Sequence, residues 1–127
     1  MQIDVTPDER TAESLSPEHL RQAVQAVLED GFVILANVVD HSVLDILRER
    51  MEKDSHELIA AEKWGGAGRI KGHLQQGPPP FAPYVHRDIV ANPFAIQVTH
   101  AILGDGMYNR FYNGNCNCPG SGTQPLH

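Results

Sequence analysis

The sequence predicts an α+β fold in which helices lead and strands follow. Three amphipathic segments open with helix-capping residues, the first near residue 16 and the last near residue 92. Short apolar or alternating runs, at residues 32–36 and 107–113, are typical of strands. Because the helices come early and the sheet has barely begun, we expect the N-terminal portion of a domain rather than a finished one.

The composition is that of an ordinary globular protein of one domain in size. The chain has 127 residues, of which 41% are hydrophobic and 20% charged. A net charge of -6 and ten scattered Lys and Arg residues argue against a nucleic-acid binder, because phosphate binding needs clustered basic side chains. The N-terminal residues lack a secretory signal pattern, and the apolar runs are too short to span a membrane. We therefore expect a cytoplasmic protein without a membrane partner.

The first helix is predicted from its caps and its apolar spacing. Residues 1–15 are polar without sustained periodicity, and we expect a flexible N-terminal arm there. Ser16 is then the expected N-cap, Pro17 occupies the first helical position and Gly31 lies just past the end. The apolar run at residues 32–36 that follows is typical of a short strand buried on both faces.

Two further helices flank a long irregular stretch. Asp40 is the expected N-cap of a long helix that ends at Gly65 and Gly66. Residues 65–84 hold too many Gly and Pro for regular structure, apart from a short strand at residues 69–74, and such a stretch is typical of a functional rim. A third helix is predicted from its cap Asn92 to its terminator Gly104, followed by a strand at residues 107–113.

Two short motifs contain metal-ligand residue types, and in both the interpretation without a metal is favoured. His86 and Asp88 flank Arg87, and on an extended segment a His and an Asp at this spacing point to the same side and can hold one ion. The following helical segment favours Asp88 as a cap or first-turn carboxylate, with the ligand pair as the alternative. Cys116 and Cys118 are too close for a relaxed disulfide and too few for a zinc site, so we expect two reduced thiols.

Several segments together resemble a known enzyme family. They are "LSPEHLRQAVQAVLEDGFVIL", the helix "VVDHSVLDILRERME", "AILGDG" and the closing "NCNCPGSGTQPLH". In this order they are similar to the first half of the phytanoyl-CoA dioxygenase family, and "PGSGTQPLH" is the most specific part. The resemblance implies the first strands of a jelly roll, or double-stranded β-helix, that this chain does not complete. Residues 16–127 would then be the N-terminal part of a single dioxygenase-like domain.

The resemblance also implies a set of site residues. The family comprises non-haem Fe(II) and 2-oxoglutarate oxygenases, and on this matching His127 is the first iron ligand of a His-x-Asp pair. The Asp and a distal His would follow beyond this sequence, so we expect the 127-residue chain by itself to be inactive. Lys71 matches a lysine of the 2-oxoglutarate site, with a solvated strand-edge lysine as the alternative. Gln124 is expected to bind cosubstrate or substrate, or else to pair with backbone in the preceding turn.

The functional hypotheses follow from this resemblance. The intact protein would use Fe(II), 2-oxoglutarate and dioxygen to hydroxylate or otherwise oxidise a small organic substrate. The alternative is a non-catalytic helical scaffold that keeps the architecture for binding a partner.

Overall fold

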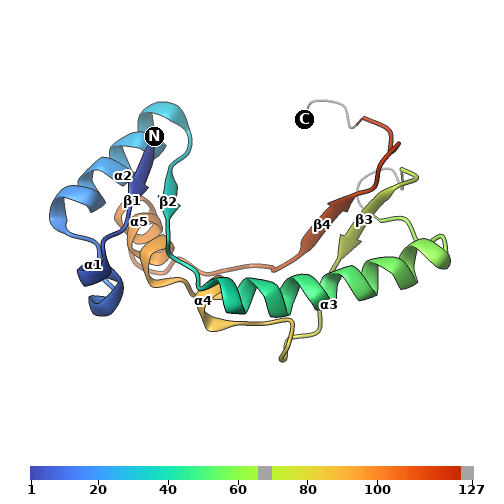
Figure 1. Cartoon of the computed structure of the whole chain (residues 1–127). Coiled ribbons are helices and arrows are strands. Elements are labelled where there is room, and N and C mark those ends of the chain that lie inside the picture. The colour runs from blue at the N-terminus through green and yellow to red at the C-terminus, as the bar shows by residue number, and fades with distance from the viewer. Residues whose placement is uncertain (66–69, 124–127) are drawn as a thin grey trace. The chain divides into compact units, whose positions relative to one another are not determined.

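The computed structural model describes residues 1–65 and 70–123, and their fold is mixed α and β (Figure 1). In chain order the elements are β1 (Gln2–Asp4), α1 (Pro7–Ala12), α2 (Pro17–Asp30), β2 (Ile34–Ala36), α3 (His41–Ala60), β3 (His73–Gln76), α4 (Arg87–Val90), α5 (Pro93–Leu103) and β4 (Gly114–Asn117). The strands of this described part form two separate two-stranded sheets, β1–β2 and β3–β4. It contains no completed jelly roll.

The chain divides into two compact units, each assembled from two separate stretches of sequence. The first unit comprises Met1–Val43 and His86–Asn109, and the second comprises Leu44–Val85 and Arg110–His127. Helix α3 begins in the first unit and belongs to the second from Leu44 onward. No helix among the described residues is long and apolar enough to cross a membrane.

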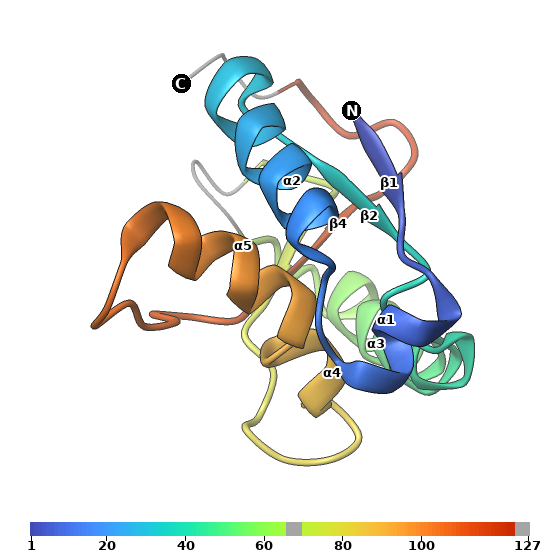
Figure 2. The same ribbon diagram turned by 90° about the vertical axis from the view of Figure 1, so that its left-hand side faces the viewer.

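In the first unit, a small parallel sheet is covered by helices. Strand β1 pairs with β2 in parallel, and the chain between them passes through α1 and α2, since parallel strands need a crossover connection. Figure 2 shows α2 and α5 side by side next to this sheet. The sequence correctly predicts both helices: Ser16 Oγ accepts from His19 N at 3.2 Å, and Gly31 ends α2 with φ of 81°.

The structure differs from the flexible arm predicted for residues 1–15. This segment forms β1 and α1, and its apolar side chains Ile3, Val5 and Leu15 are buried in the core. Three apolar residues separated by polar ones produce no sustained period, so the pattern could not be detected. The buried positions are instead defined by a partner strand and helix that lie far along the chain.

The buried carboxylate of Glu9 connects the first turn of α1 to the start of α2. Glu9 is only 7% exposed, and its carboxylate accepts hydrogen bonds from Ser16 N at 2.6 Å and Thr6 N at 2.9 Å. Thr6 returns a bond to Glu9 N, which completes a capping box, and His19 Nδ1 lies 3.0 Å from the same carboxylate. These backbone N–H groups, Ser16 first, lower the pKa of Glu9 from 4.5 to about 2.

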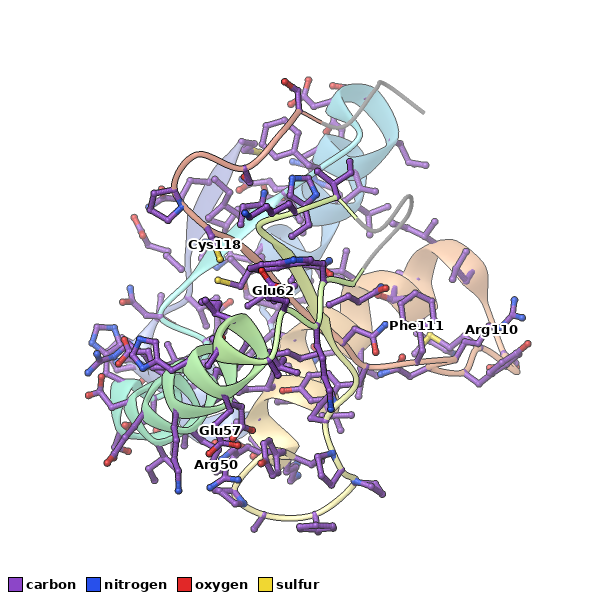
Figure 3. All side chains as sticks on the ribbon, turned by 90° about the vertical axis from the view of Figure 1, so that its right-hand side faces the viewer. Arg50, Glu57, Glu62, Arg110, Phe111 and Cys118 are labelled. Carbon is purple, nitrogen blue, oxygen red and sulfur yellow. The ribbon has the colours of Figure 1, made fainter. Side chains whose placement is uncertain are left out.

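In the second unit, α3 packs against the antiparallel β3–β4 pair. The register joins His73 to Asn117 and Gln76 to Gly114. Gln76 Nε2 donates to Ser55 Oγ of α3 at 3.0 Å. Gly114 lies against α3, where an added Cβ would meet the flexible end of the Met51 side chain, 2.5 Å from its Cε. Figure 3 shows Arg50 and Glu57 on α3, and Cys118 just beyond β4.

The second unit departs from the sequence prediction in its boundaries. Asp40 caps α3 as expected, with its carboxylate accepting from Ser42 N at 2.7 Å. The helix ends at Ala60 rather than at Gly65, because Glu62 adopts a left-handed φ of 50° and Lys63 N bonds back to Leu58 O. A non-glycine residue in this conformation is uncommon, so the sequence favours the later glycines as the helix end.

The strand predictions are partly wrong. The strand expected at residues 32–36 is shortened to Ile34–Ala36, and Ile34 is 51% exposed rather than buried on both faces. The strand expected at residues 69–74 begins later, as β3. The strand expected at residues 107–113 is absent: β4 is Gly114–Asn117, and the aromatic side chains of Tyr108 and Phe111 are exposed. Alternation alone does not make a strand, because a strand needs a partner, and β3 pairs with the later residues.

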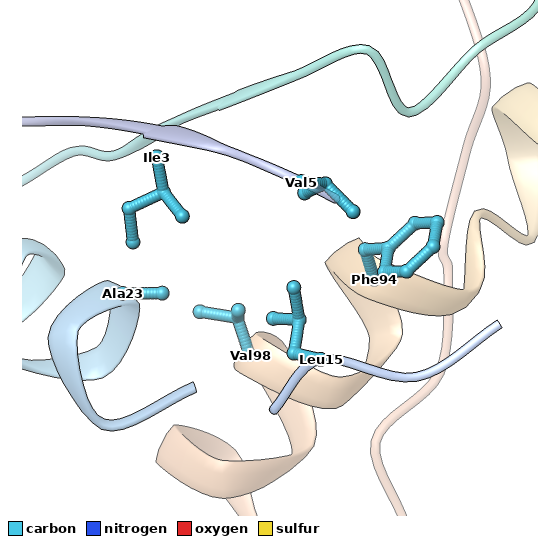
Figure 4. Close-up of a cluster of buried hydrophobic side chains, with 6 residues drawn as sticks. All are labelled: Ile3, Val5, Leu15, Ala23, Phe94 and Val98. Atoms are coloured by element: carbon cyan, nitrogen blue, oxygen red, sulfur yellow. The ribbon is translucent and has the colours of Figure 1, made fainter. Parts of the chain in front are cut away.

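The clearest hydrophobic core lies in the first unit (Figure 4). Its buried side chains come from β1, the adjoining loops, α2 and α5: Ile3, Val5, Leu15, Ala23, Phe94 and Val98. Asn92 caps α5 from a buried position beside this cluster, as the sequence predicts. The core therefore joins segments about 80 residues apart in sequence, and the first unit depends on both of its stretches.

Candidate functional site

The start of β3 runs directly beside the Gly-rich segment that follows β4. Cys118 N donates to Gly72 O at 2.8 Å, which extends the contact between the two strands by one step. Gly72 has φ of 87°, and a Cβ there would lie 2.7 Å from Ser121 Cβ. Only glycine allows so close an approach at this positive φ. The backbone at Gly72 therefore packs directly against residues 118–122.

Lys71 therefore lies next to the segment that leads towards residues 124–127. It is exposed and borders a cavity of about 400 Å³, whose other walls are Ile59, Trp64, Ile70, Gly72 and residues 118–122. Within residues 1–65 and 70–123, no carboxylate forms an ion pair with its ammonium group. An unpaired ammonium at the rim of a small cavity is suited to binding a carboxylate of a ligand.

The other two predicted site residues, Gln124 and His127, lie outside the described residues. Of the three predicted site residues, Lys71 is therefore the one whose surroundings the structure describes. No group of three or more His, Cys, Asp or Glu side chains in the described part of the chain could hold a metal ion.

His73 is a residue at this site that the sequence reasoning missed. It is 6% exposed, and its Nε2 lies 2.7 Å from Gly122 O. Its Nδ1 is buried and has no hydrogen-bond partner among the described residues. The only signal in the sequence is its place directly after Lys71 and Gly72, which is too weak to separate it from the other histidines.

The structure favours the structural interpretation of the His86-Arg87-Asp88 motif. His86 is the N-cap position of α4 and Asp88 lies in its first turn, so the extended segment that a ligand pair needs is not formed. Arg87 makes a bidentate ion pair with Glu13, with both N–O distances 2.7 Å, and this guanidinium lowers the pKa of Glu13. The prediction of Asp88 as a first-turn carboxylate is confirmed.

A second cavity, of about 590 Å³, lies in the second unit between α3 and the irregular stretch after β3. Tyr84 is buried there, and its hydroxyl accepts from Arg50 Nε at 2.6 Å and donates to Asp54 Oδ2 at 2.7 Å. Arg50 Nη2 also lies 3.2 Å from Asp54 Oδ1, and the hydrogen bond to Tyr84 raises the pKa of Arg50. The three side chains use their hydrogen-bonding groups on one another. This indicates that they attach the irregular stretch after β3 to α3 and do not form a reactive site.

The two cysteines are free and half-buried, and Cys116 lies on β4 rather than in the loop that the sequence predicts for both. Cys116 lies on β4 opposite Leu74, and both cysteines border a shallow cavity under α3. Comparison with known protein families finds none whose profile matches this chain.

Proposed function

We propose that this chain is the N-terminal part of a non-haem Fe(II)- and 2-oxoglutarate-dependent oxygenase acting on a small organic molecule. In this proposal the fold is the beginning of a jelly roll, and β3 and β4 are two of its first strands. His127 is the first metal ligand, Lys71 binds 2-oxoglutarate, and Gln124 contacts cosubstrate or substrate. The protein works in the cytoplasm, which agrees with its two free cysteines.

One observation carries the proposal: the position of Lys71. The motif that resembles the family, "PGSGTQPLH", begins at Pro119, and its first residues run beside Lys71 and Gly72. Lys71 and Pro119 are about 50 residues apart in sequence, and the antiparallel pairing of β3 with β4 places the described start of the motif beside Lys71. A carboxylate-binding lysine and a metal-binding histidine must both reach one cosubstrate, so their segments have to be neighbours.

The side chains have separable tasks. The iron centre, when bound, supplies the oxidation of substrate coupled to decarboxylation of 2-oxoglutarate. The Lys71 ammonium is free to form a charge-assisted hydrogen bond with the distal or proximal carboxylate of the cosubstrate. The Gly-rich turn at residues 119–122, closed by the bond from Ser121 N to Cys118 O, precedes His127 in the sequence.

The test is 2-oxoglutarate turnover to succinate by the full-length protein with Fe(II). We expect His127→Ala to abolish turnover. Lys71→Ala should raise the KM for 2-oxoglutarate by about 10-fold, which corresponds to about 1.4 kcal/mol for one charge-assisted contact. Lys63→Ala is the matched control, because Lys63 is also exposed but borders the cavity between α3 and the irregular stretch after β3.

Two results would contradict the proposal. Absence of Fe(II)-dependent succinate formation by the wild-type protein, under conditions where it is folded, would favour the alternative of a non-catalytic scaffold. Equal KM values for Lys71→Ala, Lys63→Ala and wild type would remove Lys71 from the cosubstrate site, even if His127 proved essential.

A further inference from the structure

Cys118, just beyond β4, borders two cavities of the second unit (Figure 3). One is the cavity of about 400 Å³ that Lys71 also borders, and the other is the shallow cavity under α3. Of these two cavities, Cys116 borders only the one under α3. Both thiols are half-buried and neither is in a disulfide. The two cysteines are therefore close in sequence but have different surroundings.

Strand pairing covers Cys116 more than Cys118. Cys116 lies opposite Leu74, a buried side chain of β3, and directly opposite residues share one face of the sheet. One step further along, Cys118 N donates to Gly72 O at 2.8 Å. Glycine, which has no side chain, thus takes the place opposite Cys118 that Leu74 takes opposite Cys116. The cavity beside Cys118 can form because of this difference.

The two cavities also differ in charge. Among the described residues that border the first cavity, Lys71 alone is charged, and Ile59 and Trp64 supply apolar walls. Its ammonium has no carboxylate partner in the part of the chain that the structure describes. Under α3, the cavity is bordered by Arg48 and Glu52, which form an ion pair at 3.1 Å. An unpaired cation attracts anions more than a neutralised pair does, so an anionic reagent should collect near Cys118.

We propose that Cys118 is a site of thiol modification by small disulfides that carry carboxylates, and that Lys71 selects these reagents. The ammonium of Lys71 pairs with a carboxylate of the reagent while the thiol reacts with its disulfide. This inference goes beyond the proposed function, because the modification requires neither iron nor cosubstrate.

The reaction is a thiol–disulfide exchange. The Cys118 thiolate attacks one sulfur of the reagent, so a new S–S bond forms and the S–S bond of the reagent breaks. The other half of the reagent leaves as a thiolate, which takes up a proton equivalent to the one that Cys118 loses. The reagent is the oxidant: one half of it is reduced to a thiol, while Cys118 is oxidised to a mixed disulfide.

The test compares two disulfides of opposite charge on the full-length protein. Glutathione disulfide carries carboxylates, whereas the ends of cystamine are ammonium groups. Mass spectrometry follows the rate of modification, and fragmentation of the peptide assigns each adduct to Cys116 or Cys118. With glutathione disulfide we expect Cys118 to react about 10-fold faster than Cys116 in the folded protein. In the protein unfolded in urea, the two thiols should react at similar rates.

Lys71→Ala tests the selection of the reagent. It should lower the rate of glutathione disulfide at Cys118 by about 5-fold without slowing cystamine. The ratio of the two rates within one variant reports the charge, even where the substitution also changes the access to the thiol. Lys63→Ala is the matched control, because Lys63 is exposed but borders the cavity between α3 and the irregular stretch after β3. High salt should bring the wild-type ratio close to that of Lys71→Ala.

Three results would overturn the proposal. Equal rates at Cys116 and Cys118 in the folded protein would remove Cys118 as a distinct site. So would the absence of an adduct at Cys118 under conditions that modify the unfolded chain. A ratio of rates in Lys71→Ala equal to that of wild type would show that Lys71 does not select the reagent. These results leave the proposed function unaffected, because its test is succinate formation.

Discussion

Replacing Asn92 with alanine should strongly destabilise the first unit, because this one side chain satisfies four backbone groups. Asn92 is 6% exposed, and its Oδ1 accepts from Phe94 N and Ala95 N at 3.1 Å each. Its Nδ2 donates to Val38 O and Asp88 O at 2.9 Å each. The amide therefore caps α5 and also holds the chain after β2 and the residues of α4.

The magnitude follows from what alanine leaves behind. Loss of the N-cap costs about 1 kcal/mol, and each partly buried carbonyl left without a donor adds about 1 kcal/mol. We expect the free energy of unfolding to fall by about 3 kcal/mol in Asn92→Ala. Asn92→Ser keeps an acceptor for the cap but no amide donor, so it should recover about 1 kcal/mol of this loss.

Pulse proteolysis in urea can measure these differences at protein concentrations low enough to limit aggregation. The control is Asp40→Ala, which removes the exposed cap of α3 and should cost no more than about 1 kcal/mol. The reasoning would be refuted if Asn92→Ala cost as little as Asp40→Ala. It would also be refuted if Asn92→Ser were as stable as wild type, since the two donated hydrogen bonds would then contribute nothing.

Two further predictions concern pH and the second unit. Because the pKa of Glu9 is lowered from 4.5 to about 2 on folding, its stabilisation is complete above about pH 4.5 and is lost as the pH falls towards 2. Glu9→Gln should flatten the curve of melting temperature against pH in this range at any salt concentration. The control is Glu18→Gln, because Glu18 is exposed and paired with Arg21. Its effect on the same curve should disappear in 0.5 M salt, roughly three times the physiological ionic strength. Tyr84→Phe should lower the free energy of unfolding by about 1–2 kcal/mol, because it removes the buried hydroxyl between a guanidinium and a carboxylate. Tyr112→Phe, which loses one longer bond of 3.2 Å to a carbonyl, is its control, and equal effects of the two would contradict this account.

The parts of the fold that could be predicted are those that depend on neighbouring residues. The N-caps Ser16, Asp40 and Asn92 and the terminators Gly31 and Gly104 act within one turn of their helices, and each is where the sequence predicts it. The strands depend on distant partners. β4 begins at Gly114 because its residues match β3 across the sheet, and local alternation at residues 107–113 contains no information about that partner.

The candidate site divides in the same way. Lys71 could be proposed from a resemblance, but its position beside residues 118–122 depends on strand pairing. His73 could not be identified, because its role depends on a carbonyl 49 residues away. The same holds for Arg50, Asp54 and Tyr84, which meet only when the irregular stretch folds back onto α3. A polar side chain that is not part of a helical or strand pattern can be assigned a role only when its distant hydrogen-bond partner is known.

The interleaving of the two units along the chain determines when each can fold during synthesis. Gln97 on α5 accepts a hydrogen bond from Leu15 N and donates one to Glu13 O, across 82 and 84 residues. At a translation rate of about 5–20 residues per second, the first helices would wait roughly 4–17 s for this partner to be made. During that interval the apolar side chains of β1 and α2 have no helix to cover them. The ribosome-bound chain should therefore need a chaperone until α5 has left the exit tunnel.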